Sequence, residues 1–416
     1  MKVALVNAFY HPDEPGGAER SVRTLARALA DRGHRVCVIC LSERPGKDHV
    51  DGIEVHRLPV DNAYLPSSQQ PRTAAEKLVW HLRDTRNARA AGRVGAVLSR
   101  FGADLVHTNN LAGMSTRVWR EAGRIGLPVV HTTRDFYLLC PRSSMVGRNG
   151  PCHRQCLSCR AFAWPRIAES RRVAAVVGIS HFVLARHRAH GCFPNASEHV
   201  IHNAYDPPLP PVRRPACVLP TIGFIGRLVA EKGVEQLIAA LRRLRERGVD
   251  AQLLIAGEGK ACYVDALRAA AEGLPVTFVG RQKPHEFFRR IDVTVVPSIW
   301  EEPMGRVVVE SYANGRPVVM TPTGGLPELA SGAAAMVAAG CSADMLADAV
   351  ATMIERLRNP REDLFDAATR SSANFGSGEM AARYEAVYLR AMADSAASRP
   401  LSAKAVSLEA QGREGS

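Results

Sequence analysis

Residues 221–247 read TIGFIGRLVAEKGVEQLIAALRRLRER, and this stretch decides the fold class. Its first five residues form a short apolar run that predicts a buried strand, and residues 233–247 carry apolar side chains at helical spacing. Two basic residues, Arg227 and Lys232, stand in the turn between them. A strand that leads through a short loop into a helix is the repeating unit of a parallel sheet covered by helices.

The same alternation runs through both halves of the chain. Apolar runs predict strands at residues 2–7, 35–40, 53–58, 104–108, 128–131, 174–179, 199–201, 221–225, 251–255, 276–279, 293–296 and 317–320. Helical spacing predicts helices at residues 16–30, 73–100, 233–247, 262–272, 284–291, 306–314, 343–357 and 378–393. The pattern indicates an α/β protein with doubly wound parallel sheets.

A proline-rich stretch divides the chain. Residues 205–220 contain six prolines, a density that blocks both helix and central strand and predicts a stiff linker. We therefore expect an N-terminal domain at residues 1–204 and a C-terminal domain at residues 221–376. Residues 377–396 predict a terminal helix that packs back on the N-terminal domain, and residues 397–416 predict a disordered tail.

Length and composition exclude several classes of protein. The chain has 416 residues, of which 46% are hydrophobic and 23% are charged, as in ordinary globular proteins. No window contains the roughly 18 consecutive apolar residues of a spanning helix, and the first residues lack the apolar core of a secretory signal. We expect a cytoplasmic protein.

The basic charge lies in the first half. Of the 54 Lys and Arg and 41 Asp and Glu in the chain, residues 1–210 hold 29 and 17, and the remainder holds 25 and 24. A basic surface attracts anionic partners. The excess favours an anionic membrane surface or an anionic glycan as the partner of the N-terminal domain, unless it only promotes solubility.

The second half contains further polar residues at expected strand and helix ends. Glu302 precedes and Glu310 lies on the helix expected at residues 306–314. Free N–H groups at a helix N-terminus bind anions, and a carboxylate accepts hydrogen bonds from vicinal hydroxyls. Together with the two cations after residue 226, these carboxylates suit a nucleotide-sugar pocket, although their spacing alone also suits a helix cap and a solvated face.

Taken together, these motifs resemble those of the family 4 retaining glycosyltransferases. The sequence GGAE at residues 16–19 resembles the family's N-terminal loop, GRLVAEKG at residues 226–233 its donor-phosphate motif, and GGLPE at residues 324–328 its glycine-rich turn. Glu302 and Glu310 match its paired glutamates. The resemblance implies the GT-B fold, in which two Rossmann-like domains face a cleft, and a nucleoside-diphosphate sugar as donor.

The resemblance also implies roles for individual residues. Arg227 and Lys232 bind the donor diphosphate, Glu302 faces the donor sugar and Glu310 holds the ribose. Those implied in catalysis are Arg227, Lys232, Glu302, Arg134 and Asp135, and those implied in donor binding are Gly16, Gly17, Gly226, Arg227, Lys232, Glu302, Gly305, Arg306 and Glu310. The acceptor, a glycan or a lipid-linked molecule, is expected on the N-terminal domain, in surface polysaccharide or glycolipid biosynthesis.

The sequence contains no Asp-x-Asp motif, with which many transferases hold a divalent metal. Fixed cations and a helix N-terminus can instead stabilise the charge that develops on the leaving phosphate. We therefore predict that catalysis needs no cofactor or metal ion.

One position departs from the family pattern. The sequence VVHTTRDFYLLCP at residues 129–141 places Arg134 where the family usually has a histidine, and it keeps Asp135. Arginine cannot act as a general base at neutral pH. In a front-face retaining reaction the leaving phosphate can accept the proton, so that Arg134 would be free to bind a phosphate or the acceptor.

A loop rich in cysteine follows. Cys140, Cys152, Cys156 and Cys159 lie within twenty residues, with His153 among them. Four thiolates suit a tetrahedral structural zinc site, and reduced thiols, two disulfides or an iron–sulfur cluster are the alternatives.

Two other functions fit parts of the sequence. A nucleotide-sugar epimerase could use the same fold, and a basic, zinc-bearing protein could bind membranes or nucleic acid. The expected helix at residues 73–100 carries five arginines, but aromatic stacking residues are scarce there and nucleic-acid binding would leave the ordered donor motifs unexplained. We expect no nucleic-acid partner.

Overall fold

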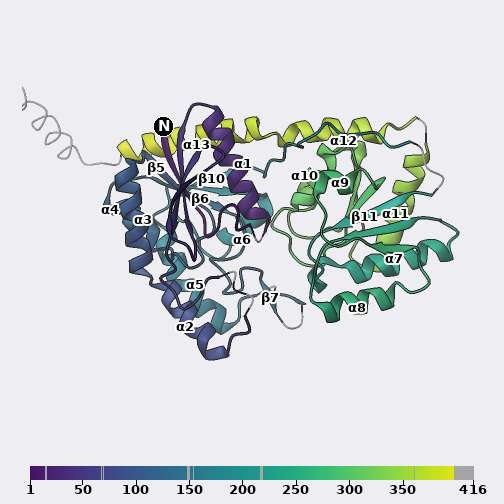
Figure 1. Ribbon diagram of the computed structural model, residues 1–416, viewed down its shortest axis with the longest axis horizontal. Coiled ribbons are helices and arrows are strands. Elements are labelled where there is room, and N and C mark those ends of the chain that lie inside the picture. The colour runs from purple at the N-terminus through teal and green to yellow at the C-terminus, as the bar shows by residue number, and fades with distance from the viewer. Residues whose placement is uncertain are drawn as a thin grey trace, which may run out of the picture.

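The structure, a computed structural model, describes residues 1–397 except 15, 67, 69, 148, 149, 153, 216–218 and 360. Two α/β domains lie side by side, each built around a parallel sheet (Figure 1). The predicted fold class is confirmed. The tail at residues 398–416 and part of the linker lie outside the described residues, and residues 205–215 form neither helix nor strand.

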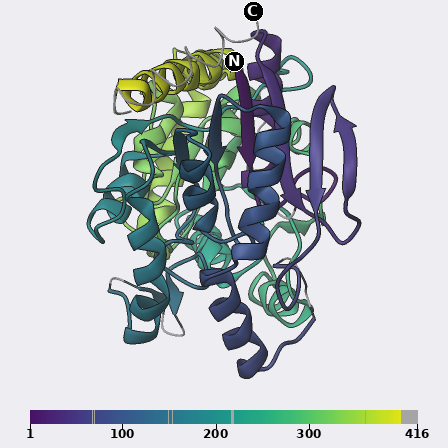
Figure 2. The same cartoon turned by 90° about the vertical axis from the view of Figure 1, so that its left-hand side faces the viewer.

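The N-terminal sheet has the strand order β10-β9-β6-β5-β1-β2-β4-β3. All neighbours are parallel except β3 and β4, which form an antiparallel hairpin at one edge (Figure 2). The bounds are β1 Lys2–Val6, β2 Arg35–Leu41, β3 Gly46–Val50, β4 Ile53–Leu58, β5 Leu105–Thr108, β6 Val129–Thr133, β9 Ala175–Gly178 and β10 Ser197–Val200. Strands β1, β5, β6 and β9 are buried along almost their whole length, as the apolar runs predict.

The C-terminal sheet is parallel throughout, in the order β13-β12-β11-β14-β15-β16. Its strands are β11 Thr221–Ile225, β12 Gln252–Ala256, β13 Val276–Phe278, β14 Val293–Val296, β15 Val318–Met320 and β16 Ala335–Val337. A small hairpin, β7 Val146–Gly147 and β8 Gly150–Pro151, lies in the cysteine loop.

Helices cover both sheets. In the N-terminal domain they are α1 Gly17–Asp31, α2 Ala74–Thr85, α3 Ala88–Phe101, α4 Arg117–Arg124, α5 Leu157–Ser170 and α6 His181–Arg188. In the C-terminal domain they are α7 Val234–Glu246, α8 Ala261–Ala270, α9 Pro284–Phe288, α10 Arg306–Ala313, α11 Ala343–Arg358 and α12 Leu364–Ser372. No helix in the described part of the chain is long and apolar enough to cross a membrane.

The chain ends on the domain where it began. Helix α13 (Ser377–Ala397) packs against α1 (Figure 1). Its buried tyrosines Tyr384 and Tyr388 join the apolar cluster that includes the β1 side chains. The chain therefore passes between the domains twice, and the two passages are hydrogen-bonded to each other. The Tyr205 N–H donates to the Phe375 carbonyl at 3.1 Å, and the Ser377 N–H donates to Asp206 Oδ1 at 3.1 Å.

The expected single helix at residues 73–100 is wrong, because the chain forms two helices there, α2 and α3. The side chain of Asn87 caps α3 by accepting from the Ala90 N–H at 3.0 Å. Asparagine readily bonds to nearby backbone in this way and so favours a new helix start over continuation. The Trp80 side chain is buried and donates its indole N–H to the Tyr64 carbonyl at 2.8 Å.

Candidate active site

Two loops at the carboxyl edge of the C-terminal sheet bring Lys232 and Glu302 together. Lys232 ends the short helix η1 (Ala230–Lys232) beyond β11, and Glu302 lies between β14 and α10. The Lys232 ammonium pairs with Glu302 Oε1 and lies 5.5 Å from the centre of the Trp300 ring. Ser298 Oγ donates to the same carboxylate oxygen at 2.7 Å. The pairing places a cation and a carboxylate where open α/β sheets bind ligands.

Glu302 is charged although it is buried. Burial alone would raise its pKa, but the Lys232 charge and the hydrogen bonds from Lys232 and Ser298 outweigh that effect and hold the pKa below its ordinary value. A carboxylate fixed in this way can accept hydrogen bonds from sugar hydroxyls without first losing a proton.

The glycine-rich turn at residues 324–328 supports the Glu302 loop. Gly324 has φ +58°, and a Cβ there would lie 2.2 Å from the Glu302 carbonyl oxygen, so only glycine fits. The Gly325 N–H donates to that carbonyl at 2.8 Å. Glu328 reaches the other domain and accepts from the N–H groups of His181 and Phe182 at 2.6 and 2.7 Å.

The second carboxylate, Glu310, lies on α10 and exposes only 3% of its surface. Arg306 Nε donates to Glu310 Oε1 at 2.7 Å, and Arg20 Nη1 of helix α1 lies 3.7 Å from the same oxygen. Arg306 Nη1 also donates to Ser21 Oγ at 3.0 Å. Glu310 is therefore held by arginines from both domains.

The N-terminal loop meets α10 at this point. Gly305 adopts φ +101° and precedes the first turn of α10. A Cβ on Gly17 would lie 3.4 Å from Arg306 Cδ. Gly16 caps α1, and its N–H donates to Glu19 Oε2 at 3.0 Å. Gly16, Gly17, Gly305, Arg306 and Glu310, which the sequence predicts for donor binding, thus gather at the junction of the two domains.

Gly226 and Arg227 lie beside Lys232 at the end of β11. The Gly226 N–H donates to the Ala256 carbonyl at 3.0 Å, which extends the sheet. Arg227 is exposed, and its side chain forms no ion pair within the described residues. Its guanidinium is therefore available to a ligand.

Arg134 and Asp135 follow β6 on the N-terminal side. Asp135 accepts from Asn110 Nδ2 at 2.6 Å and from the Tyr137 N–H at 2.8 Å. Burial raises the pKa of Asp135, although these hydrogen bonds oppose the effect. Arg134 is 7% exposed and donates to Asn109 and Asn203.

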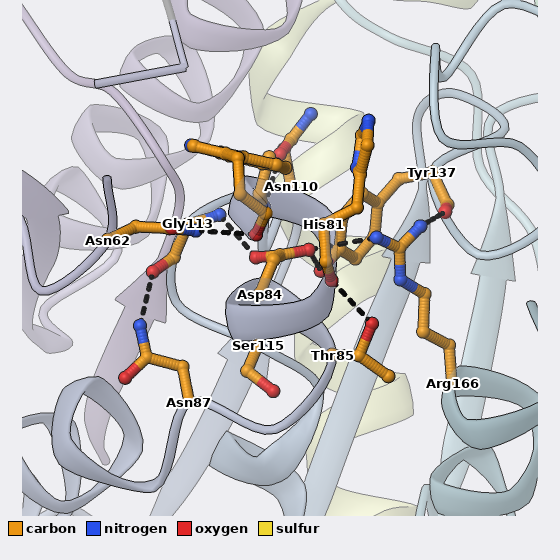
Figure 3. A network of polar contacts seen from close by, with 12 residues as sticks. Asn62, His81, Asp84, Thr85, Asn87, Asn110, Gly113, Ser115, Tyr137 and Arg166 are labelled. Carbon is orange, nitrogen blue, oxygen red and sulfur yellow. Dashed lines mark hydrogen bonds and ion pairs between the residues drawn. The ribbon is translucent and has the colours of Figure 1, made fainter. Parts of the chain in front are cut away.

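A buried ion pair lies behind the Asp135 loop (Figure 3). Asp84 of α2 and Arg166 of α5 are 0% and 1% exposed and lie 2.9 Å apart. The Tyr137 hydroxyl donates to Asp84 Oδ2 at 2.6 Å, and Arg166 Nη1 donates to the Tyr137 carbonyl at 2.6 Å. Because the Tyr137 N–H also bonds to Asp135, this network ties α2 and α5 to the active-site loop.

The four cysteines of the loop differ in how far they are exposed. Cys140 is buried, Cys152 and Cys159 are half-buried, and Cys156 is exposed just before α5. No group of three or more His, Cys, Asp or Glu side chains among the residues described here is arranged to hold a metal ion, and His153 is not one of these residues. The zinc site stays a prediction.

Several site residues could not be found from sequence motifs. Ser298 and Trp300 contact the Lys232–Glu302 pair, Arg20 and Ser21 reach α10 from the other domain, and Asn203 contacts Arg134. Arg20 and Ser21 adjoin the GGAE motif, and Ser298 and Trp300 lie four and two residues before Glu302, so each pair has a local signal. Asn203 contacts Arg134 across 69 residues, and no spacing rule reveals such a contact.

Comparisons with known proteins show the family of this chain. Residues 16–204 match the family model described as a glycosyl transferase 4-like domain, and residues 219–356 match glycosyl transferases group 1. An uncharacterized protein of a cps region in Klebsiella pneumoniae is 31% identical over 332 residues, which cover 79% of this chain and 87% of the relative.

Two solved structures share the fold. Sucrose-phosphate synthase from Thermosynechococcus elongatus superposes with a TM-score of 0.73 at 21% identity, over 94% of this chain and 99% of that one. Anabaena HepE in complex with UDP-glucose has a TM-score of 0.66 at 20% identity, over 96% of this chain and 100% of that one.

Two α/β domains, each with a parallel sheet, and the solved structures that share this arrangement define a GT-B fold. The chain belongs to the glycosyltransferase family that joins a 4-like N-terminal domain to a group 1 C-terminal domain.

Proposed function

We propose that the protein transfers a sugar, with retention of configuration and without a metal ion, from a nucleoside-diphosphate sugar to a glycan or a lipid-linked acceptor. The observation that carries this proposal is the arrangement of Lys232, Glu302 and Glu310 around the start of α10. The UDP-glucose bound to the HepE structure supports a nucleotide-sugar donor.

In this proposal the donor diphosphate binds between Arg227, Lys232 and the free N–H groups at the start of α10. The leaving group gains negative charge as the glycosidic bond to the phosphate breaks, and fixed cations and backbone dipoles stabilise that charge without reorganising. Glu302 orients the donor sugar, and Glu310 accepts hydrogen bonds from the ribose hydroxyls.

The reaction needs no protein base in this scheme. The leaving phosphate oxygen accepts the proton of the acceptor hydroxyl on the same face of the sugar. Arg134 cannot act as a base, and burial disfavours the charged form of Asp135. Both residues are therefore assigned to binding and positioning.

The basic N-terminal domain is proposed to hold the acceptor at an anionic membrane surface. On α2, Leu78, Val79 and Leu82 are 50%, 42% and 56% exposed. Arg83 is exposed on the same helix. Cations near an anionic surface contribute on the order of 1 kcal/mol each, and exposed aliphatic side chains add apolar contact.

The donor assignment is tested with UDP-, ADP- and GDP-sugars, by calorimetry and by their slow hydrolysis. We expect one nucleotide series to bind, and Glu310→Gln to weaken it about tenfold or more, since hydrogen bonds to a charged group contribute about 1.5–3 kcal/mol. Arg268→Gln, at an exposed site on α8, is the matched control. Failure of every series to bind would refute the donor proposal.

The membrane assignment is tested by co-sedimentation with vesicles of anionic and of neutral lipid. Binding should require the anionic lipid, weaken with salt and weaken again in Leu78→Ser/Leu82→Ser. Absence of binding at low salt would mean a soluble acceptor. Retention on DNA under the same conditions would instead favour the nucleic-acid alternative.

A further inference from the structure

Arg134 is a buried arginine whose visible partners are neutral. Its Nε donates to Asn109 Oδ1 at 2.7 Å, and its Nη1 donates to Asn203 Oδ1 at 2.5 Å. Both acceptors are side-chain amides. Within the described part of the chain, no carboxylate forms an ion pair with this guanidinium, although only 7% of the residue is exposed.

Two donors of this cluster remain unused. Arg134 Nη2 and Asn109 Nδ2 are both buried and have no hydrogen-bond partner among the described residues. An unpaired buried charge is costly, and buried polar groups are nearly always satisfied. Two unused N–H donors beside a buried cation suit an anionic oxygen atom.

The cluster lies against the donor loop. The Asn203 N–H contacts Met304 Sδ at 3.2 Å, and Met304 precedes the start of α10. Burial lowers the pKa of Arg134, the Arg306 charge lowers it further, and the Glu19 charge opposes the effect. Arg306 and Glu19 belong to the two segments that meet at the domain junction.

The approach to Arg134 is restricted. A cavity of about 10 Å³ borders Arg134, Asn109 and His131. That volume has room for a water molecule at most, but not for a phosphate or carboxylate group. An acidic ligand therefore cannot use this cavity, and we infer that it approaches Arg134 from the side on which Asn203 contacts Met304 of the donor loop.

We propose that Arg134 and Asn109 form an oxyanion subsite that binds an acidic group of the donor substrate. The inference rests on the proposed function and adds a residue that the donor motifs do not include. The planar guanidinium edge fits a phosphate or a carboxylate through parallel N–H donors. The acidic group is either the diphosphate of the nucleotide or a carboxylate on the transferred sugar.

Calorimetry with UDP, UDP-glucose, UDP-glucuronate and inorganic pyrophosphate distinguishes the two sources. If the subsite binds the diphosphate, Arg134→Gln weakens all four ligands by about tenfold or more, the order of a charge-assisted hydrogen bond. If it binds a sugar carboxylate, the unmodified protein prefers UDP-glucuronate to UDP-glucose by a similar factor. Arg134→Gln then removes the preference and leaves UDP affinity unchanged.

Two further variants separate binding from folding. Arg134→Lys keeps the charge and replaces Arg134→Gln in the titrations if that variant fails to fold. It should lose most of the ligand affinity that Arg134 contributes, because an ammonium lacks the paired N–H edge. Arg316, which is 4% exposed and donates to the Phe288 and Val212 carbonyls, is the matched buried control. Arg316→Lys should alter stability without altering ligand affinity.

The inference is overturned if the folded Arg134 variants bind all four ligands as the unmodified protein does. A protein that binds no nucleotide of any series contradicts the proposed function instead, and titrations with pyrophosphate and with free glucuronate then still decide the subsite. Weaker binding of either anion to Arg134→Gln than to the unmodified protein supports the subsite, and equal binding of both anions to the two proteins refutes it.

Discussion

At the scale of single residues, four charges of the site are paired with one another. Lys232 pairs with Glu302, and Arg306 pairs with Glu310, whereas Arg227 and Arg134 form no ion pair among the described residues. Each buried charge is stable only because its partner is present. Removing one partner should therefore affect stability as well as binding.

Lys232→Met should destabilise the protein by about 3 kcal/mol, the order observed when one partner of a buried pair is removed. The reason is that Glu302, only 6% exposed, would lose its counter-charge. The double variant Lys232→Met/Glu302→Gln should recover most of this loss. Urea unfolding measures both, and a double variant no more stable than the single one would contradict the pairing.

Buried histidines predict acid sensitivity. Burial lowers the pKa of His131 to about 3 and that of His187 to about 4, below the ordinary 6.5. The unfolded chain therefore binds more protons between pH 6.5 and about 3, and stability should fall as the pH falls through this window. Melting temperatures from pH 7 to 4 test this. His131→Phe should show a shallower pH slope, whereas a shallower slope in the exposed-site control His49→Phe would point to another cause.

At the scale of elements, the sequence predicted the long buried strands better than the short or exposed elements. The buried strands β1, β11 and β14 are mainly apolar runs, and their hydrophobicity marks them. The helices α4, α5, α6 and α12 and the short strands β7, β8 and β16 were missed. Exposed strand β3 was missed because all its residues are polar or small except Val50, and it is held by pairing with β4.

The ordered motifs predicted the C-terminal half of the site more completely than the N-terminal half. A glycine that a tight turn requires, such as Gly324, and a charged residue near a strand end, such as Glu302, can be recognised from the neighbouring sequence. The hydrogen-bond partners of Arg134 are Asn109 and Asn203, which are 25 and 69 residues away from it in the sequence. Such contacts depend on how the strands are ordered in the sheet, which periodicity does not encode.

The network of Figure 3 joins three elements and should dominate the stability of the region around α2 and α5. Asp84→Asn and Arg166→Met should each cost about 3–5 kcal/mol, because each leaves a buried charge unpaired. The double variant should cost less than the two single losses combined. Arg268→Ala, at an exposed pair with Asp265, should cost under about 1 kcal/mol in the same urea series.

The cysteine loop carries a prediction of its own. If Cys140, Cys152, Cys156 and Cys159 bind zinc, protein purified under reducing conditions should contain about one metal ion per chain. Cys156→Ser/Cys159→Ser should abolish it, and Cys262→Ser, at an exposed cysteine on α8, should not. Elemental analysis that finds neither zinc nor iron rejects a metal site.

At the scale of the whole molecule, the two domains are held together by contacts that also belong to the active site. Arg20 and Ser21 of the N-terminal domain reach Glu310 and Arg306, and Glu328 of the C-terminal domain reaches α6. Ligand affinity and domain arrangement should therefore be coupled.

Helix α13 should be required by the N-terminal domain. A chain that stops after Gly376 loses the hydrogen bonds from Tyr384 to Thr132 and from Tyr388 to His107 and uncovers their apolar cluster. We expect it to be insoluble or to melt well below the full chain. A chain that stops after Ala397 is the control and should melt as the full chain does. Equal melting of the shorter chain would show that α13 is dispensable.

The paired passages between the domains also restrict how the enzyme can move. The backbone of Tyr205 is hydrogen-bonded to that of Phe375, and Asp206 is hydrogen-bonded to Ser377. The two connecting segments therefore act together as one hinge. Such a hinge permits the domains to swing about a single line but opposes sliding or full separation. A donor could then enter by a swing that breaks the Arg20–Glu310 contact, and the return swing would bring Arg134 back to the same place in every catalytic cycle.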